Sequence, residues 1–375
     1  MSGEHSPLAP SSAARRVQCS GSTRAEAAYP QGEDSPEAAE GTAAHWGVAE
    51  MLSGRLIDPG LIAPNGVFLT AEMCEAADLM YDDVVRELAP YGLRPQDGKV
   101  EQRVDIPSVH PQSWGTPDYH IWPAPQSLLL YDFKFGHRPV PAFENWQLIE
   151  YVAGALDPVV RDGLHEQSIR VTVKIVQPRV HHRDGPIRSW SFMASDIRGH
   201  VNIAHAAAHE ALGPSPRFKV GPECRDCRAR HACEALQRAA MSACDIAGIG
   251  QPFDLPPAAM ALEYRTLKRY ETLIAARISG LEEQLLSLGR AGKPTPGLRI
   301  EHGAGREGWT VTDAQVILIG QALGVNVAKP AEAMTPKQAV KAGLPEAVLP
   351  GLVNTPRGAA KLVDDDGSLA RRIFA

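Results

Sequence analysis

The stretch Ser127-Leu-Leu-Leu-Tyr-Asp132-Phe-Lys134, preceded by Trp114-Gly-Thr-Pro-Asp118, places two carboxylates and a lysine in apolar surroundings. An apolar run that ends abruptly in charge is typical of a buried strand. Because Asp132 and Lys134 are two residues apart, their side chains project from the same face of such a strand. A carboxylate and an ammonium group are costly to bury unless they are paired or bind an ion. The pattern therefore predicts either a surface ion pair or, together with Asp118, a site for a divalent metal ion.

Predicted helices on either side of this stretch carry further polar side chains. Ser35 followed by Pro36 predicts the start of a helix, with a serine N-cap and a proline in the first turn, and this helix contains His45. A later helix carries Gln147 and Tyr151 at positions i and i+4, and hence on one face. The alternatives are a packing role for Gln147 and Tyr151 and an ion pair with a nearby glutamate for His45.

In this order, the elements resemble the PD-(D/E)XK nuclease superfamily, and Gly115-Thr-Pro-Asp118 is similar to the second motif of its RecB-like branch. The resemblance covers residues 10 to about 240. It implies an α/β fold in which a mixed central sheet is flanked by helices. It also implies hydrolysis of a DNA phosphodiester, with catalytic roles for Asp118, Asp132, Lys134, Gln147 and Tyr151.

The same resemblance implies the ligands of the catalytic metal. Asp118 and Asp132 would bind Mg²⁺ or Mn²⁺, which are hard ions that prefer oxygen ligands. The backbone carbonyl of Phe133 would add another oxygen, and His45 would add a nitrogen that favours Mn²⁺. Lys134 would orient the attacking water and stabilise negative charge on the phosphate.

Four cysteines form a second candidate site. The segment Cys224-Arg-Asp-Cys227-Arg-Ala-Arg-His-Ala-Cys233 has C-x2-C-x5-C spacing, and Cys19 lies far upstream. Thiolates bind iron–sulfur clusters and zinc alike, so the spacing alone does not distinguish a [4Fe-4S] cluster from Zn²⁺ or from unconnected buried cysteines. RecB-like nucleases of the AddB kind carry one cysteine before the nuclease motifs and three after them. That resemblance implies a [4Fe-4S] cluster held by Cys19, Cys224, Cys227 and Cys233.

The composition excludes some classes of protein. Of the 375 residues, 44% are hydrophobic and 22% charged, which predicts an ordinary soluble protein. No apolar stretch approaches the roughly 20 residues that span a membrane, and we expect no secretory signal. Cysteines in a ligand-like arrangement favour a reducing compartment, so a cytoplasmic location is expected. The net charge of -6 argues against a non-specific DNA coat but not against a nuclease, whose metal site is acidic.

Basic residues gather in two segments, one between the later predicted strands and one around the cysteines. Each is either a DNA contact or a solvated face, and in the first we expect Arg179 and Arg183 to contact DNA. Gly303-Ala-Gly305-Arg-Glu-Gly308 matches the dinucleotide-binding fingerprint, yet the residues after it look extended and no βαβ unit surrounds it. We therefore expect a glycine-rich hairpin that presents Arg306 to DNA.

Periodicity predicts the other elements. Alternation predicts a strand from Lys99 to Pro107, with Glu101 on its charged face. For Glu101 we expect an ion pair with Arg103 or a neighbour, and an approach to the metal site is the alternative. Further strands are expected at 117–122, 127–135, 168–176 and 187–193, and further helices at 70–88, 142–156 and 196–212.

A change in composition at Gln251-Pro-Phe-Asp-Leu-Pro-Pro257 predicts two domains, 1–250 with the candidate sites and 251–375. Beyond it, apolar residues from Leu267 to Leu288 recur at spacings of three and four, which predicts a long amphipathic helix. Residues 251–375 are expected to form a mainly helical accessory domain without active-site residues. Residues 1–34 are expected to lie over the surface, anchored at Cys19.

The combined pattern predicts an enzyme, a Mg²⁺- or Mn²⁺-dependent deoxyribonuclease that acts as an exonuclease. Its partner would be DNA with free ends or single-stranded regions. The layout also resembles a phage-associated group of RecB-like nucleases, which implies a role in recombination, replication or repair beside a phage single-strand-binding or annealing protein. Two alternatives remain: a non-catalytic DNA-binding or scaffold protein with a nuclease fold, and a zinc-stabilised interaction protein.

Overall fold

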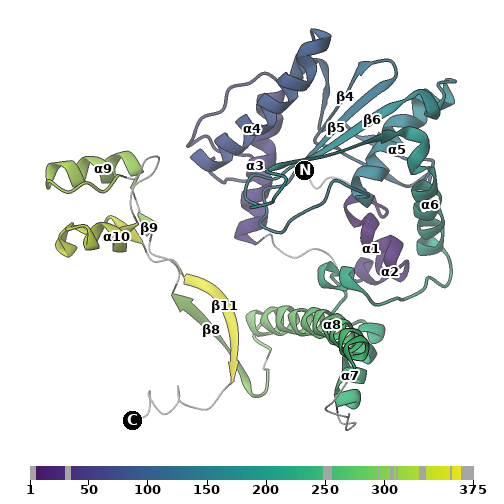
Figure 1. Cartoon of the computed structure of the whole chain (residues 1–375). Helices are drawn as coiled ribbons and strands as arrows, with labels where there is room; N and C mark the ends of the chain where they lie inside the picture. The colour runs from purple at the N-terminus through teal and green to yellow at the C-terminus, as the bar shows by residue number, and fades with distance from the viewer. Residues whose placement is uncertain are drawn as a thin grey trace. The chain divides into compact units, whose positions relative to one another are not determined.

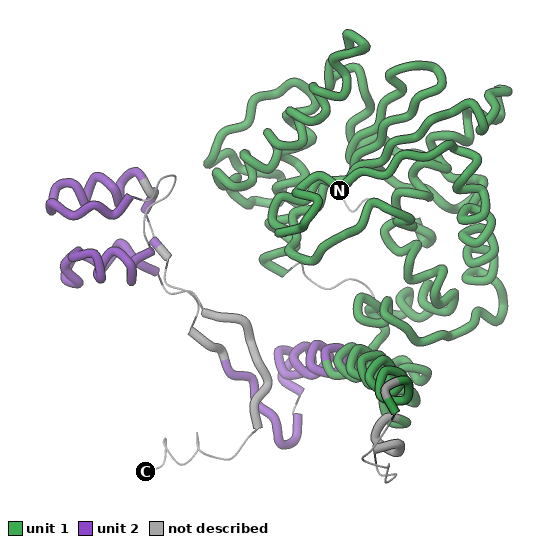
Figure 2. Tube along the Cα trace, viewed as in Figure 1, with its two compact units in different colours: residues 1–278 green, residues 279–375 purple. Residues whose placement is uncertain are grey.

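Two compact units make up the protein, Met1–Ile278 and Ser279–Ala375 (Figure 2). The computed structural model describes residues 6–29, 35–247, 256–293, 295–304, 308–309, 311–328, 335–354 and 357–364. The division between the units falls inside one long helix, α8 (Pro257–Arg290). The expected boundary at residues 250 and 251 lies outside the described residues.

A five-stranded mixed sheet forms the centre of the first unit (Figure 1). The strands lie in the order β1-β4-β5-β6-β7; β5 and β6 are parallel and the other neighbours antiparallel. The predicted α/β class with a mixed central sheet is confirmed. The sheet strands are β1 (Lys99–Val100), β4 (Tyr119–Ala124), β5 (Ser127–Phe133), β6 (Arg170–Val176) and β7 (Ile187–Met193), and a separate pair is formed by β2 (Val104–Asp105) and β3 (Trp114–Gly115).

Helices cover both faces of this sheet (Figure 1). Successive side chains of a strand point to opposite faces, and β5 follows this rule. Leu129 and Tyr131 pack in the core with α3 and α4, whereas Leu128 and Leu130 pack with α5 on the other face. The remaining helices of the unit flank these layers. The helices before α8 are α1 (Ala13–Gln18), α2 (Gly21–Ala27), α3 (Pro36–Leu52), α4 (Ala71–Leu88), α5 (Trp146–Arg161), α6 (Arg198–Leu212) and α7 (Glu234–Ala247).

Side-chain caps fix where the site-bearing helices begin. The hydroxyl of Ser35 accepts a hydrogen bond from the N–H of Ala38 at the start of α3, as its sequence predicts. Thr70 caps α4 in the same way, and Asn145 caps α5. None of the helices among the described residues is long and apolar enough to cross a membrane.

The strand expected from Lys99 to Pro107 is interrupted. Pairing stops after Val100, and Glu101 has a positive φ of 46°, a conformation that non-glycine residues rarely adopt. Regular structure resumes only at β2. Alternation in the sequence therefore marked two short strands correctly but could not reveal the turn between them.

The N-terminal segment is packed into the unit rather than laid over its surface. Leu8 and Arg16 are fully buried. The guanidinium group of Arg16 forms an ion pair with Glu150 of α5, and both side chains are inaccessible to solvent. Such a pair is costly to break, because removing one partner leaves the other charge buried and uncompensated. The segment is therefore part of the core that supports α5.

The second unit contains strands as well as helices. Its small core includes Val316, Val327, Ala339 and Leu344. The region expected to be mainly helical thus also has two antiparallel strand pairs. Beyond α8 the elements are β8 (Leu298–Ala304) paired with β11 (Arg357–Asp364), β9 (Gly308–Trp309) paired with β10 (Val353–Asn354), α9 (Asp313–Ala322) and α10 (Pro336–Lys341).

The first half of α8 should be needed for the stability of the first unit, because Leu273 and Ala276 pack on the fully buried Leu236. A chain that ends at Gly292 keeps these contacts and should melt close to the first transition of the full protein. A chain that ends at Pro256 should lose about 2–5 kcal/mol, as for a large apolar deletion, and melt roughly 5–15 °C lower. Calorimetry checks this; equal melting temperatures for the two truncations would contradict it.

Candidate functional site

Strand pairing brings the two predicted aspartates together. In the antiparallel ladder between β4 and β5, Tyr119 lies opposite Tyr131. Continuing this register by one residue places Asp118, which directly precedes β4, opposite Asp132 near the end of β5. The two side chains are 9% and 2% exposed, so both carboxylates lie almost out of contact with water.

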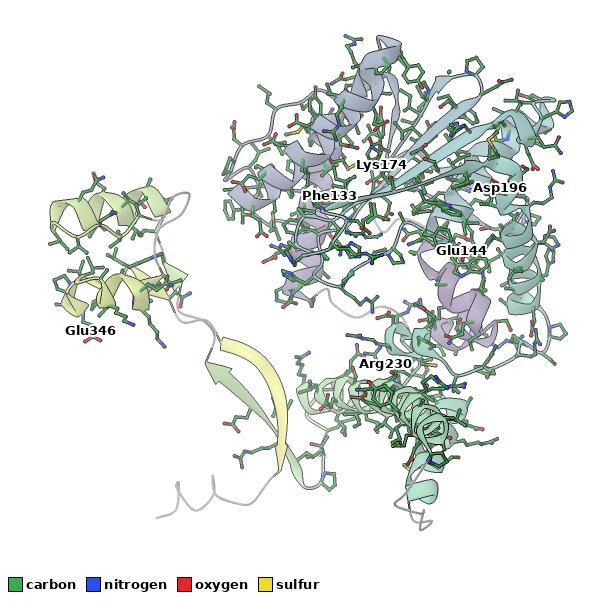
Figure 3. The ribbon with its side chains drawn as sticks, in the orientation of Figure 1. Phe133, Glu144, Lys174, Asp196, Arg230 and Glu346 are labelled. Atoms are coloured by element: carbon green, nitrogen blue, oxygen red, sulfur yellow. The ribbon has the colours of Figure 1, made fainter. Side chains whose placement is uncertain are left out.

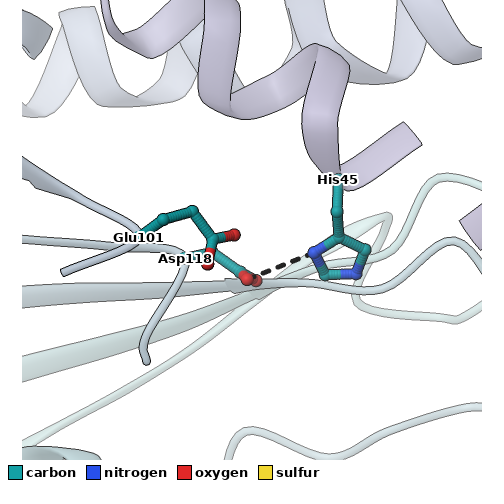
Figure 4. Close-up of side chains that lie close together, drawn as sticks. All are labelled: His45, Glu101 and Asp118. Carbon is teal, nitrogen blue, oxygen red and sulfur yellow. Dashed lines mark hydrogen bonds and ion pairs between the residues drawn. The ribbon is translucent and has the colours of Figure 1, made fainter. Parts of the chain in front are cut away.

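Asp118 is the best-connected residue of the site. Its Oδ2 accepts a hydrogen bond of 2.6 Å from the N–H of Phe133, a residue labelled in Figure 3. Its Oδ1 lies 3.1 Å from Nδ1 of His45 on α3, as the dashed line in Figure 4 shows. Asp118 thereby joins a helix to the sheet. The metal contact expected from the carbonyl of Phe133 stays a prediction, and the observed contact is made by its amide.

Glu101 joins His45 and Asp118, and the sequence did not favour this (Figure 4). One ligand atom from each of the three side chains lies within 4.8 Å of the others. The expected ion pair with Arg103 is wrong, because Arg103 pairs with Asp105 at 2.8 Å. The charged face of this segment was the only signal in the sequence, and the turn at Glu101 that aims the side chain at the site leaves no pattern there.

Lys134, Gln147 and Tyr151 form a chain of contacts beside the aspartates. The ammonium group of Lys134 donates to Oδ1 of Asp132 at 3.1 Å and lies 2.9 Å from Oδ2, a contact without hydrogen-bond geometry. It also donates to Oε1 of Gln147 at 3.2 Å. The amide of Gln147 donates in turn to the hydroxyl of Tyr151 at 3.3 Å. The i, i+4 pair on α5 therefore positions the lysine.

Burial and mutual contacts shift the pKa values of these groups in different directions. Burial raises the pKa of Asp132, and Lys134 offsets this only in part. Burial also acts to raise the pKa of Asp118, but His45 and Lys134 outweigh it and hold the pKa below its usual range. Partial desolvation and the Asp118 carboxylate raise the pKa of Glu101 to about 8. Two neighbouring carboxyl groups with opposed shifts are common at functional sites.

Glu101 and Asp118 line an open cleft of about 700 Å³ together with His45 and Lys134, and Asp132 is not among its lining residues. Its walls are the first turns of α3, the end of β5 and the residues around Glu101 and Asp118. The donor set of carboxylate oxygens and one imidazole suits Mg²⁺ or Mn²⁺. Oδ2 of Asp132 is buried without a hydrogen-bond donor and lies 2.9 Å from the ammonium group of Lys134. The residues therefore fit a divalent metal ion.

All four predicted cluster cysteines line a second cavity in the same unit. Cys19 directly follows α1, and the other three lie between α6 and α7. Backbone N–H groups of Lys219 and Gly221 donate to the sulfurs of Cys19 and Cys224, each at 3.4 Å. Burial raises the pKa of Cys227 to about 12. The structure thus places Cys19 beside residues some two hundred positions away.

The expected DNA-contacting arginines have different surroundings. Arg179 forms ion pairs with Glu40 at 3.1 Å and Glu72 at 2.8 Å, and it stacks on the ring of Phe135. These contacts occupy its guanidinium group within the protein. Arg183 has a side chain that is 90% exposed and lies 3.6 Å from Asp184. Arg306 lies outside the described residues.

Divalent metal should bind at the acidic cleft, and removal of one ligand should weaken binding. For Asp118→Asn and Asp132→Asn we expect Mn²⁺ affinity to fall at least tenfold, because each replaces a charged oxygen ligand by a neutral one. Glu101→Gln should have a comparable effect, because one of its carboxylate oxygens lies within 4.8 Å of the ligand atoms of His45 and Asp118. Asp162→Asn, at the exposed far end of α5, is the matched control. Isothermal titration calorimetry measures these affinities, and equal values for Asp132→Asn and the control would refute the site.

Both clusters lie within the region of the chain that matches a single protein-family model. The matching family model spans residues 5–368 and so includes every acid, the lysine and the four cysteines discussed above. Its description assigns no activity, so chemistry must be argued from the side chains themselves. By this match, the chain belongs to the family described as "Protein of unknown function (DUF2800)".

Proposed function

We propose that this protein is a metal-dependent deoxyribonuclease with a PD-(D/E)XK core of the RecB-like type. One observation carries the proposal: Asp118, Asp132 and Lys134 come together at adjoining strand ends, and Asp118 and Lys134 line an open cleft with His45. Two acids, a histidine and a lysine in such a cleft are the groups needed to bind a divalent ion and stabilise a phosphate under attack. A surface ion pair would not require two almost fully buried aspartates.

The arrangement of the elements supports the same proposal. The motif residues come, in chain order, from a helix, two adjoining strands and a second helix, and α5 leads from β5 to its parallel neighbour β6. Gln147 on α5 contacts Lys134, as the resemblance to RecB-like nucleases implies. The order of the motifs is a property of the sequence, whereas the contacts between their side chains are a property of the fold. The two observations therefore support the proposal separately.

The residues of the cleft divide the chemistry among them. A divalent ion held by His45, Glu101 and Asp118, whose ligand atoms lie within 4.8 Å of one another, with Asp132 as a proposed further ligand, would supply Lewis acidity and a water of lowered pKa. Lys134 is held by Asp132 and Gln147 so that its charge faces the position of the phosphate, where negative charge develops in the transition state. Glu101 adds a third carboxylate at the mouth of the cleft.

DNA with free ends or single-stranded regions is the substrate we propose, with exonucleolytic cleavage. The cleft is open rather than enclosed, so it can admit a strand. A role in phage-type recombination, replication or repair, beside a single-strand-binding or annealing protein, is proposed on the sequence resemblance alone.

Purified protein should degrade DNA when Mg²⁺ or Mn²⁺ is present. Asp132→Asn should abolish cleavage, and Lys134→Ala should slow it about 100-fold or more, as for loss of one electrostatic stabiliser. End-labelled linear DNA and covalently closed circular DNA are digested in parallel, and an exonuclease leaves the circles intact. Asp162→Asn should cleave like the parent. Cleavage by Asp132→Asn at the parental rate would contradict the assignment of this site as a nuclease active site.

We further propose that the four cysteines hold a [4Fe-4S] cluster rather than zinc. Zinc, with a Zn–S bond of about 2.3 Å, needs its sulfurs within about 4 Å of one another. Among the described residues no three cysteine sulfurs lie within 4.8 Å of one another. A four-iron cluster keeps its thiolates farther apart, and hydrogen bonds from backbone N–H groups to cysteine sulfur are a usual feature of such sites.

Anaerobically purified protein should be brown and contain about four irons and four sulfides per chain. Changing any one of Cys19, Cys224, Cys227 or Cys233 to Ser should release iron. The Cys19 variant should also expose the N-terminal segment to proteases. Cys74→Ala, which changes a buried cysteine of α4 outside the cavity, should keep its iron. Stoichiometric zinc without iron in anaerobic protein would contradict the cluster.

A further inference from the structure

A small pocket lies at the edge of the sheet, beside the acidic cleft. Its volume is about 210 Å³. It is lined by Leu93, Asp97, Gly98, Lys99, His120, Ile121 and Trp122. None of these residues belongs to the set that the nuclease proposal uses. Its walls are mostly apolar, with a few polar groups among them, which is the usual character of a pocket for a small organic group.

Strand register places this pocket one step from the acidic cleft. Glu101 donates its N–H to the carbonyl of Asp118, and Lys99 is paired with His120 in the same ladder between β1 and β4. Lys99 and His120 are each two residues along the chain from Glu101 and Asp118, which corresponds to up to about 6.6 Å of extended backbone. That spacing is comparable to one nucleotide of an extended strand.

His120 carries an unsatisfied polar atom into this region. The side chain is 8% exposed, and its Nδ1 is buried without a hydrogen-bond partner. Buried polar atoms in native proteins almost always have partners, and the exceptions call for an explanation. The ring of His120 also lines the pocket, so a ligand there can bond to an imidazole nitrogen.

The pocket is built from fixed parts. Tyr119 donates its hydroxyl hydrogen to the carbonyl of Pro95 at 3.0 Å, and a Cβ at Gly98 would overlap that hydroxyl. The pairing of β4 with β5 shifts between Ile121 and Ala124, an irregularity that lets consecutive side chains line one cavity. The indole of Trp122 is half-buried and forms a flat wall.

The charges favour a neutral group inside and an anion outside. Asp97 is already used, because its carboxylate accepts a hydrogen bond of 2.7 Å from the N–H of Arg94. Lys99 is exposed, and among the described residues its ammonium has no ion-pair partner. With one acid and one base at the rim, the pocket itself attracts no anion, whereas Lys99 can reach a phosphate that passes by.

We propose that Lys99, His120 and Trp122 form a subsite for one unpaired nucleotide of the substrate strand, next to the phosphodiester that is cleaved. The base would enter the pocket against Trp122 and bond to His120, and Lys99 would contact its phosphate. Aromatic side chains stack with any base, so the subsite would be tolerant of sequence. The base must leave a duplex to enter, so the cleaved end must be single-stranded or frayed. This inference rests on the proposed function.

Binding without cleavage tests the subsite. The full-length chain with Asp132→Asn is titrated in Mg²⁺ against fluorescent single-stranded oligonucleotides, and anisotropy gives the affinity. Trp122→Ala should weaken binding roughly 5- to 100-fold, as for loss of one base stack, and Trp122→Phe should restore most of it. Lys99→Gln should lower the slope of log affinity against log salt by about 0.7, as for one phosphate contact. Tyr91→Ala, an exposed aromatic close in sequence but outside the pocket, is the matched control.

An abasic nucleotide distinguishes stacking from a general structural role. Moving one abasic position along the oligonucleotide should reveal one place where the missing base weakens binding to the parent. In Trp122→Ala that penalty should disappear, whereas in Lys99→Gln it should persist. A penalty of the same size in Trp122→Ala and the parent would overturn the subsite, as would a variant that binds like the parent. Cleavage by the otherwise unaltered protein is scored separately, so the subsite can fail while the nuclease assignment stands.

Discussion

Asp118 and Asp132 lie side by side at the ends of two antiparallel strands, where little water reaches them. Two carboxylates so placed repel each other, and each is penalised by its loss of hydration. Much of the first unit is arranged to offset this cost. The sheet contributes the Phe133 amide and Lys134, and α3 contributes His45. The Phe133 amide and Lys134 come from one segment at the end of β5 and His45 comes from another, so the site exists only when both segments are folded together.

Local pattern was sufficient for much of this unit. The run ending at Asp132, the serine cap before α3 and the alternation in β6 and β7 are short-range signals, and the elements they predicted are present. What could not be predicted depends on distant partners. Helices as short as α1 and α2 are unstable alone, so helix propensity does not predict them. They form here because Leu8 and Arg16 are buried. Glu101 reaches the cleft through a single residue with positive φ, which leaves no periodic trace.

In the candidate site, too, local signals could be read from the sequence, whereas contacts between distant residues could not. The aspartates, the lysine and the pair on α5 were singled out by their order along the chain and its resemblance to RecB-like nucleases, while spacing indicated only which side chains share a face. The partner of Arg16, by contrast, is Glu150, and no rule of spacing joins two residues so far apart. For Arg179, the sequence showed the charge but not the residues that pair with it. Its charge suggested a nucleic-acid contact, but Glu40 and Glu72 already engage it, and only the folded structure reveals that.

The N-terminal segment is synthesised before the parts of the chain that hold it in place, and it cannot settle until they follow. Arg16 needs a partner on α5, and Cys19 shares its cavity with residues that follow α6. A growing polypeptide therefore carries its opening helices without a docking surface until more than half of its length has left the ribosome. During that interval their apolar and charged groups contact only solvent or chaperones. The order of synthesis thus opposes the order of assembly for this segment.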